Sequence, residues 1–426
     1  MSFSISRRGF LAGGVAAAVS GLGPQARAGA RRRVAANDRI AIGFIGVGSL
    51  GGGHHLPRVL GMPDFEVLAV ADPDRRHTAS ALERIAGSKK GGANATAYVD
   101  YRELLDRNDL DAVLISTPDH WHALNLIHAC QAGKDVYCEK PLSLTIGEGR
   151  AMVEAARRAG RVVQVGTQQR SDRRFRQACE LVRNGKIGKL KSVRCVLGRG
   201  PTEKRTADAA PPPELDWQLW LGPAPSVPFN ERRCHYQFRW FFDYSGGKLT
   251  DWGAHHLDIA QWGLGHEDSG PVAVEGTGTF PSDNFFETPV DFEVRATYAD
   301  GAELIATGAG ENGVTFTGSD GEIFVSRGKI TATNPELLKL EPGAVGPVVL
   351  HASADHHADF VRAVRERGRT ASDIEVAHRS ATVGHLGNLA IRLGRRLQWD
   401  PVVERFVGDD AANRLISKPM RHPWSL

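Results

Sequence analysis

Two short stretches carry residue types that could stabilise an alkoxide and move a proton. The first is Cys138-Glu139-Lys140-Pro141, which follows the apolar run Asp135-Val136-Tyr137. Such a run is typical of a buried parallel strand, and ligands of open α/β sheets bind beyond the carboxyl ends of the strands. A lysine held there, before a proline with restricted φ, is well placed to touch a substrate. The alternative is a surface lysine in a strand-to-helix turn.

The second stretch reads as a helix from Asp251 to near Gly265. Asp251, His255 and Asp258 are spaced i, i+4, i+7 and therefore share one face. A carboxylate one turn from a histidine can orient the imidazole and raise its basicity, as a general acid/base needs. The alternative is a capping aspartate with a buried structural histidine. Because adjacent histidines point about 100° apart on a helix, the pair His255-His256 is a poor zinc site, and we expect no metal.

A glycine-rich turn near the start of the chain predicts a bound dinucleotide. The sequence Gly46-Val47-Gly48-Ser49-Leu50-Gly51 follows an apolar strand, residues 39–45, and precedes a helix-length segment, residues 52–60. In this pattern the first glycine allows a tight turn and the second lets the backbone approach a pyrophosphate. The third glycine lets the helix pack closely on the strand. The expected cofactor contacts are Gly46, Gly48, Ser49, Leu50 and Gly51.

An acidic residue follows the second strand at the position that a dinucleotide site requires. Residues 65–71 are apolar, and the run ends at Asp72, about 20 positions after the glycines. A carboxylate at this place hydrogen-bonds the adenosine ribose, which favours NAD. Arg75 and Arg76 are close enough in sequence to receive a 2′-phosphate. NADP therefore remains open, with Arg75 as a candidate contact.

Alternating strands and helices continue to residue 166 and predict a parallel, doubly wound sheet. The strand at 111–116 ends in Thr117-Pro118-Asp119-His120-Trp121-His122, a polar and aromatic turn on the cofactor side. His120 and His122 are equally compatible with contacts to nicotinamide ribose or substrate and with packing. We therefore expect a Rossmann domain over residues 38–166.

The second half has a different character. Apolar and polar residues alternate in several segments between 272 and 326, which predicts an antiparallel sheet, and two late helices follow. Residues 167–426 are thus expected to form an α+β domain. Aromatic side chains with polar rims suit carbohydrate binding, but they are also good core material. Both interpretations remain open for the tryptophans concentrated here, which are Trp217, Trp220, Trp240, Trp252 and Trp262.

Length and composition set broad limits. A chain of 426 residues has room for two domains, and a formal net charge of +4 is too small to indicate a nucleic-acid partner. The five cysteines are an odd number without paired spacing. They indicate neither a disulfide framework nor a zinc pattern.

The N-terminus predicts export. The sequence Ser6-Arg7-Arg8-Gly9-Phe10-Leu11 precedes a mildly apolar run to about Leu22 and then Ala26-Arg27-Ala28. This is the pattern of a twin-arginine signal with a small-residue cleavage site, over residues 1–28, with a polar leader at 29–37. The apolar run is too short for a stable membrane anchor. We expect a periplasmic or secreted protein that retains its cofactor.

Together these motifs resemble the Gfo/Idh/MocA family of oxidoreductases, which includes glucose–fructose oxidoreductase and inositol dehydrogenase. The resemblance runs from about residue 38 to the C-terminus and rests on the glycine turn, Thr117-Pro118-Asp119-His120, Glu139-Lys140-Pro141 and Asp251-xxx-His255. It implies a Rossmann domain followed by an α+β domain with a large, open, mostly antiparallel sheet, through which the chain forms a homo-oligomer. It also implies oxidation or reduction of a sugar or cyclitol hydroxyl with a nicotinamide cofactor.

The resemblance implies roles for individual residues. Lys140 contacts the reacting hydroxyl, His255 exchanges its proton and Asp251 supports both. Further cofactor contacts are Thr117, Pro118, His120, Glu139 and Lys140, and substrate contacts are His122, Gln168, Arg170, Trp252 and His256.

Two other functions stay open at this stage. A redox-neutral, NAD-dependent glycoside hydrolase or lyase would use the same groups through transient oxidation of the sugar. A non-catalytic dinucleotide-binding module would leave Lys140, Asp251 and His255 without a task.

Overall fold

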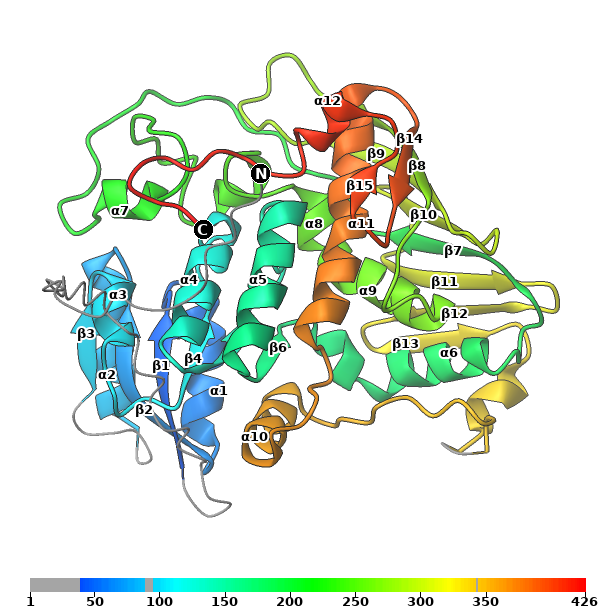
Figure 1. Ribbon diagram of the computed structural model, residues 1–426, viewed down its shortest axis with the longest axis horizontal. Coiled ribbons are helices and arrows are strands. Elements are labelled where there is room, and N and C mark those ends of the chain that lie inside the picture. The colour runs from blue at the N-terminus through cyan, green and yellow to red at the C-terminus, as the bar shows by residue number, and fades with distance from the viewer. Residues whose placement is uncertain (1–38, 89–94, 342–343) are drawn as a thin grey trace, which may run out of the picture. The chain divides into compact units, whose positions relative to one another are not determined.

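The computed structural model describes residues 39–88, 95–341 and 344–426, and these residues contain two β-sheets with their covering helices (Figure 1). The export signal and leader expected for residues 1–37 lie outside the described residues. Across the described ranges, no helix is both long enough and apolar enough to cross a membrane.

The first sheet has six parallel strands in the order β3-β2-β1-β4-β5-β6. The strand order reverses between β1 and β4, and a crevice for a ligand opens at this point in doubly wound sheets. The strands β1, β4 and β5 are buried almost throughout, because helices cover both faces. Their bounds are Ile40–Ile45 (β1), Phe65–Ala71 (β2), Thr96–Tyr98 (β3), Ala112–Ile115 (β4), Asp135–Cys138 (β5) and Val163–Val165 (β6).

The helices of this layer come mostly from the connections between strands. One turn of π-helix, η1, follows the glycine turn and continues into α1. A distant helix, α10 (His356–Glu366), also belongs to the layer, because its Phe360 and Val364 share a core with Ile40 and Phe44 of β1. The Rossmann layer is thus completed by a segment far outside residues 38–166. The other bounds are Gly51–His55 (η1), Leu56–Gly61 (α1), Arg75–Ala86 (α2), Tyr101–Leu105 (α3), Asp119–Gln131 (α4) and Ile146–Ala159 (α5).

The second sheet has nine strands in the order β13-β12-β11-β7-β10-β9-β8-β14-β15. Among these described strands, β7 and β10 pair in parallel and the other neighbours are antiparallel. The bounds are Leu190–Val196 (β7), Ala273–Thr279 (β8), Asp291–Thr297 (β9), Glu303–Thr307 (β10), Gly313–Gly318 (β11), Glu322–Ser326 (β12), Lys329–Ala332 (β13), Leu397–Asp400 (β14) and Arg405–Phe406 (β15). The predicted fold class, a Rossmann domain plus an α+β domain with a large, mostly antiparallel sheet, is confirmed.

Helices cover one face of this second sheet. Figure 1 shows α11 passing between α5 and the sheet, and its Val383 and Leu386 share a core with Val294 of β9. Strand β9 buries Phe292, Val294 and Ala296 alternately, as the sequence pattern predicts. The remaining helices are η2 (Gln168–Ser171), α6 (Arg173–Arg183), α7 (Trp217–Leu221), η3 (Gln237–Trp240), α8 (Lys248–Asp251), α9 (Gly253–Leu264), η4 (Pro335–Lys339), α11 (Ile374–Leu393) and α12 (Asp410–Asn413).

The helix that carries Asp251 and His255 begins earlier than the sequence predicts. It starts at Lys248 as α8 and continues through Trp252 into α9. Gly247 precedes it with φ 65°, and a Cβ there would lie 2.6 Å from the Thr288 side chain. This left-handed residue directs the chain into the helix one turn before Asp251.

Most of the tryptophans are core residues. Trp217 and Trp220 stack at 4.8 Å between ring centroids and form a third core with Trp240, while Trp262 packs beneath the nine-stranded sheet. Trp252 is half-buried and lies beside His255. The core interpretation of the tryptophans therefore holds for four of the five.

Candidate active site

Two glycines of the turn, Gly46 and Gly51, leave no room for a side chain. Gly46 has φ 85°, and a Cβ there would lie 2.8 Å from the backbone of Ser116 and Thr117. A Cβ on Gly51 would lie 2.1 Å from the Gly46 carbonyl oxygen, so Gly51 permits close packing and does not line the cleft. Gly46, Gly48, Ser49 and Leu50 do line a cleft with about 920 Å³ of empty space. Glycine at these positions lets the backbone approach a pyrophosphate.

Asp72 is fixed at the end of β2 on the wall of the same cleft. One carboxylate oxygen accepts a hydrogen bond from Val47 N at 2.9 Å, and the other accepts from Asp74 N at 2.9 Å and lies 3.2 Å from His77 Nδ1. Burial lowers the pKa of His77, but its hydrogen bond to Asp72 raises it above its usual value. The carboxylate is thus held where a ribose hydroxyl would meet it, and His77 is a cleft residue that the sequence analysis missed.

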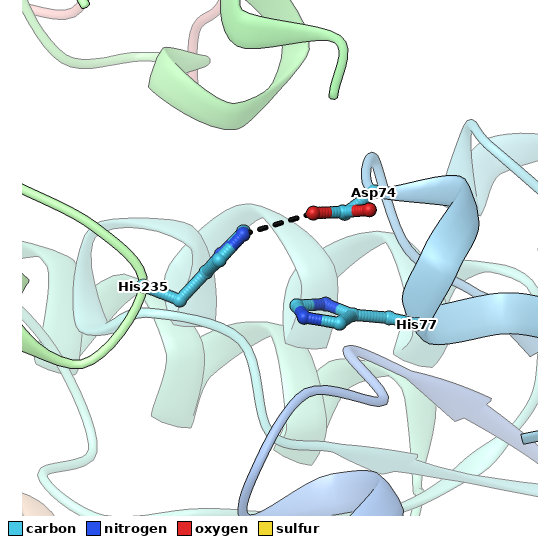
Figure 2. A group of neighbouring side chains, drawn as sticks. All are labelled: Asp74, His77 and His235. Carbon is cyan, nitrogen blue, oxygen red and sulfur yellow. Dashed lines mark hydrogen bonds and ion pairs between the residues drawn. The ribbon is translucent and has the colours of Figure 1, made fainter. Parts of the chain in front are cut away.

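A small cluster joins the two domains beside Asp72 (Figure 2). His235 Nε2 lies 3.0 Å from Asp74 Oδ2, and the rings of His77 and His235 are 4.5 Å apart between centroids. Asp74, His77 and His235 are residue types that can bind a metal ion. Among the described residues, their potential ligand atoms all lie within 4.8 Å of one another. The Arg76 guanidinium, however, already donates to both oxygen atoms of Asp74. The cluster therefore acts as a hydrogen-bonded contact between domains at the adenosine end of the cleft.

Neither arginine proposed for a 2′-phosphate lies in the cleft. Arg76 is bound to Asp74, and Arg75 is exposed and absent from the cleft lining. The contact of Arg75 with the cofactor therefore stays a prediction, without support from the cleft lining.

Because its carboxylate is fixed at the cleft wall, we expect Asp72 to influence the choice between NAD and NADP. Asp72→Ala is expected to weaken NAD binding about 10- to 100-fold, since a hydrogen bond to a charged group is lost. The same change should narrow the preference for NAD over NADP, because a carboxylate repels a 2′-phosphate. Fluorescence titration of both cofactors measures this, with the exposed Glu83→Ala on α2 as the matched control. Tighter binding of NADP than NAD by the unaltered protein would contradict the assignment.

The turn after β4 contributes to the cleft, but its histidines do not. Thr117 and Pro118 line the cleft, as expected. His120 is buried with Nε2 3.1 Å from the Trp220 carbonyl oxygen, and burial lowers its pKa to about 3. His122 lies between the carbonyl oxygens of Pro141 and Thr117, at 2.7 and 3.0 Å. Both rings thus hold neighbouring segments together outside the cleft lining, and the expected cofactor contact of His120 and substrate contact of His122 stay predictions.

Lys140 joins the two domains at the other end of the cleft. Its Nζ lies 2.6 Å from Asp251 Oδ1, and Arg239 Nε approaches the same oxygen at 3.5 Å. Burial would raise the pKa of Asp251, but the charges of Lys140 and Arg239 lower it, so the carboxylate is ionised. Both Lys140 and Arg239 line the cleft. The lysine is thus held in place by a residue 111 positions away.

Glu139 lies behind Lys140 in a buried hydrogen-bond chain. Glu139 Oε1 lies 3.0 Å from His55 Nε2, and the other ring nitrogen of His55, Nδ1, lies 3.0 Å from His357 Nε2. Glu139 Oε2 accepts a hydrogen bond from the backbone N–H of Lys140. Burial would raise the pKa of Glu139, but His55 and Lys140 lower it. A Cβ on Gly166 would lie 2.3 Å from the carboxylate, so a glycine is required there. Glu139 therefore fixes the backbone that presents Lys140.

His255 is buried, and its ring forms no hydrogen bond with any described residue. The side chain is 5% exposed and its Nδ1 is without a partner in the described ranges. Burial, together with the charges of Lys140 and Arg327, lowers its pKa well below 6.5. The imidazole is therefore neutral at neutral pH and free to accept a proton.

The structure corrects the expected grouping on this helix. Asp251 binds Lys140, and Asp258 binds Arg170 at 2.6 and 2.9 Å, so neither carboxylate orients His255. Helical spacing does place the three residues on one face, but cations from other elements attract the carboxylates more strongly.

Several of the expected substrate contacts lie outside the cleft lining and stay predictions. Arg170 is 3% exposed and bound to Asp258 and Glu267, and His256 is fully buried with Nε2 3.1 Å from Asn312 Oδ1. Gln168 is exposed and does not line the cleft. Trp252, by contrast, lies 6.0 Å from the His255 ring and under the Arg327 guanidinium.

Asp119 is a further cleft residue that the sequence analysis passed over. It accepts a hydrogen bond from Ser245 Oγ at 2.5 Å, and burial raises its pKa to about 7. Its position directly after Pro118, at the first residue of a helix beyond a strand end, is the signal that could have found it. No comparable signal marks Arg239, which lies in the short helix η3, or His235, which lies in the loop before it.

Comparisons with known proteins agree with this architecture. A model for an oxidoreductase family with an NAD-binding Rossmann fold matches residues 40–167, and one for the C-terminal alpha/beta domain of that family matches residues 200–426. A myo-inositol 2-dehydrogenase from Thermotoga maritima is 26% identical over 357 residues, covering 83% of this chain and 93% of that protein. A scyllo-inositol 2-dehydrogenase (NAD(+)) from Bacillus subtilis is 28% identical, covering 61% of this chain and 63% of its own length.

A solved structure shares the fold at lower identity. The WlbA dehydrogenase from Bordetella pertussis, in complex with NADH and UDP-GlcNAcA, superposes with a TM-score of 0.64 at 17% identity, covering 85% of this chain and 99% of that one. The two family models together span both halves of the described structure. This chain therefore belongs to the Gfo/Idh/MocA family of NAD-binding oxidoreductases.

Proposed function

We propose that this oxidoreductase oxidises a hydroxyl group of a sugar or cyclitol, or reduces the corresponding ketone, at the Lys140 end of the cleft. The observation that carries the proposal is the ion pair between Lys140, at the end of a Rossmann strand, and Asp251, one helical turn before a buried, unpartnered His255. Lys140 lines the dinucleotide cleft, and its charge is close enough to His255 to lower the pKa of the imidazole. A cation and a neutral base are the two groups that alcohol oxidation requires.

The residues of the cleft fit NAD. The glycine backbone at Gly46 and Gly48 has space for a pyrophosphate, and the Asp72 carboxylate is fixed for a ribose hydroxyl. Thr117 and Pro118 line the path between them and Lys140. When bound, NAD⁺ supplies the acceptor for the hydrogen that leaves the carbinol carbon.

The protein groups divide the remaining work. Lys140 donates a hydrogen bond to the reacting hydroxyl and stabilises its oxygen as negative charge develops. His255, kept neutral by burial and by neighbouring cations, accepts the hydroxyl proton. Asp251 is a positioning residue, because it holds the Lys140 ammonium through the contact at 2.6 Å.

The names of the relatives direct the substrate screen. The relatives from Thermotoga and Bacillus are named as inositol dehydrogenases, which supports a cyclitol or sugar substrate and gives less support to a redox-neutral glycosidase. Absorbance at 340 nm with inositols and free sugars tests the proposal, beside chromogenic glycosides for the alternative. Glycoside cleavage without any NADH formation from free polyols would overturn it.

We further propose that the protein is exported through the twin-arginine pathway and keeps its cofactor. Arg7-Arg8 and the small residues at 26–28 support this. Retention for hours requires a dissociation rate of about 10⁻⁴ s⁻¹ or slower, which at ordinary association rates implies a nanomolar or tighter Kd. The contact between His235 and Asp74 across the adenosine end would slow release.

Protein purified without added nucleotide is therefore expected to release about one equivalent of dinucleotide on denaturation, and the exported fraction should disappear in an Arg7→Lys, Arg8→Lys double variant. Liquid chromatography of the released nucleotide and cell fractionation are the measurements. Empty protein with micromolar affinity for added NAD would contradict retention. Unchanged fractionation of the double variant would contradict export.

We also propose assembly into a homo-oligomer through the second sheet. Its helix-covered face is buried, whereas residues such as Glu293 and Thr277 on the other face remain partly or fully exposed. A second copy would cover that face. Light scattering that gives a monomer mass would contradict this assembly.

A further inference from the structure

Cations outnumber ionised carboxylates around the Lys140–Asp251 pair. The single carboxylate of Asp251 serves two cations, Lys140 at 2.6 Å and Arg239 at 3.5 Å. Lys248 and Arg327 are close enough that their charges also act on Asp251 or its partners. One carboxylate thus faces four positive side chains.

The other nearby carboxylates do not restore the balance. Glu139 is ionised and its charge acts on Lys140 and Arg327, but together with Asp251 it provides only two negative charges for four cations. Burial raises the pKa of Asp119 to about 7, so Asp119 carries only part of a negative charge at neutral pH. The pyrophosphate of a bound dinucleotide does not neutralise the excess positive charge either. The glycine turn accommodates that group, and neither Lys248 nor Arg327 is among the residues that line the dinucleotide cleft.

Lys248 and Arg327 lack an ion-pair partner within the residues that the structure describes. Lys248 Nζ lies 5.6 Å from the centre of the Trp240 ring, and the Arg327 guanidinium lies 4.8 Å from that of Trp252. Lys248 is half-buried, and burial lowers the pKa of its ammonium. Arg327 is exposed, so a ligand can reach its guanidinium. Both cations therefore remain available to an anionic group of a ligand.

Arg327 is oriented towards the catalytic histidine by two neighbours. Trp252, under its guanidinium, also contacts the His255 ring. The Gln169 side-chain amide connects the two residues when its oxygen faces Arg327 and its nitrogen faces His255. In this orientation the oxygen accepts a hydrogen bond from Arg327 Nε at 3.3 Å, and the nitrogen donates one to the His255 carbonyl oxygen at 3.1 Å. No other described residue accepts from the two terminal nitrogen atoms of Arg327. They form a free fork of the kind that binds a carboxylate or phosphate through two parallel hydrogen bonds.

We infer that the substrate is a sugar or cyclitol that carries an anionic group, a carboxylate or a phosphate, and that Arg327 binds this group while Lys248 adds to the positive field. The inference rests on the proposed function and narrows its substrate class. A carboxylate and a phosphate offer the same pair of acceptor oxygens to the guanidinium. They are therefore separated by experiment.

The test uses matched pairs of probes that differ only in the anionic group. Glucuronate and glucose 6-phosphate are each compared with glucose, and myo-inositol 1-phosphate with myo-inositol, by calorimetric titration into the NAD-loaded protein. At least one anionic member is expected to bind about 10- to 100-fold more tightly than its neutral parent, as for a charge-assisted hydrogen bond. The advantage should shrink between 50 and 500 mM NaCl. If the affinity advantage appears with glucuronate, the anionic group is a carboxylate, and if it appears with a sugar phosphate or inositol phosphate, the group is a phosphate.

Variants assign the effect to the guanidinium. Arg327→Met should abolish the advantage and leave the affinity for the neutral parent unchanged, and Arg327→Lys should retain part of it. The control is Lys329→Met on the same hairpin, whose ammonium is exposed and paired with Glu311 at 2.7 Å. Equal affinity within every pair, or an advantage that survives in Arg327→Met, would overturn the inference. NADH formation from a neutral polyol in the same preparation would still support the oxidoreductase function.

Discussion

Lys140→Ala is expected to lower kcat/KM by about 10²–10⁴-fold, because the variant lacks the cation that stabilises the developing alkoxide. NAD binding should survive, since the glycine turn and Asp72 do not contact Lys140 directly. The fold should survive as well, because Arg239 remains beside Asp251 at 3.5 Å and limits the cost of an unpaired buried carboxylate. Steady-state kinetics and a fluorescence titration with NADH separate the two effects.

The exposed Lys186→Ala on the second domain is the matched control and should behave like the unaltered protein. Lys140→Arg keeps the charge but not the compact ammonium, and we expect it to recover only a small part of the activity. If Lys140→Ala turned over the identified substrate at the normal rate, the role assigned to this lysine would be wrong.

His255→Asn is expected to lower kcat by a similar factor of about 10²–10⁴, because it removes the group that accepts the hydroxyl proton. The buried ring forms no hydrogen bond with the described residues, so the substitution breaks no hydrogen bond of the side chain and loses only its packing against Trp252. Thermal unfolding should therefore change little. The neighbouring His256→Ala is the matched control on the same helix: it loses the hydrogen bond to Asn312, so stability should fall while kcat is retained.

The pH profile gives an independent test of His255. Burial and the charges of Lys140 and Arg327 lower its pKa well below 6.5, so the basic form is present throughout the neutral range. Activity should therefore be maintained as the pH falls through 6.5 and should be lost only well below that value, where the imidazole becomes protonated. An acidic limb centred at or above pH 6.5 in kcat/KM would contradict the assignment of His255 as the base.

Local patterns in the sequence were sufficient for the Rossmann domain. The glycine turn between an apolar strand and a helix, with Asp72 after the second strand, predicts a dinucleotide site, because these contacts depend on the backbone and on short-range spacing. The same holds for the strand end that presents Lys140. Alternation in β9 likewise predicts a half-covered antiparallel strand.

Only the tertiary structure decided which charges meet. Helical spacing puts Asp251 beside His255, yet the carboxylate binds Lys140 from the other domain, and Asp258 binds Arg170. Coulomb energy depends on the distance and burial of the partners, and neither quantity is encoded in spacing along one helix. Asp251 thus became a positioning residue for the lysine.

Contacts between segments that are far apart in the chain also explain why the sequence did not show the roles of two histidines or identify two residues of the cleft wall. His120 and His122 look like ligand contacts in a polar turn, but the carbonyl groups that they meet belong to Trp220 and Pro141, distant in the chain. Arg239, in the four-residue helix η3, and His235, in the loop before it, reach the cleft from segments too short to carry a periodic signal. The sequence by itself determined the cofactor fold, because backbone pattern specifies it, and it identified Lys140 and His255 as candidate reacting groups. Packing between the two domains decided which side chains surround those groups, because burial and long-range charge pairing arise only when the domains meet.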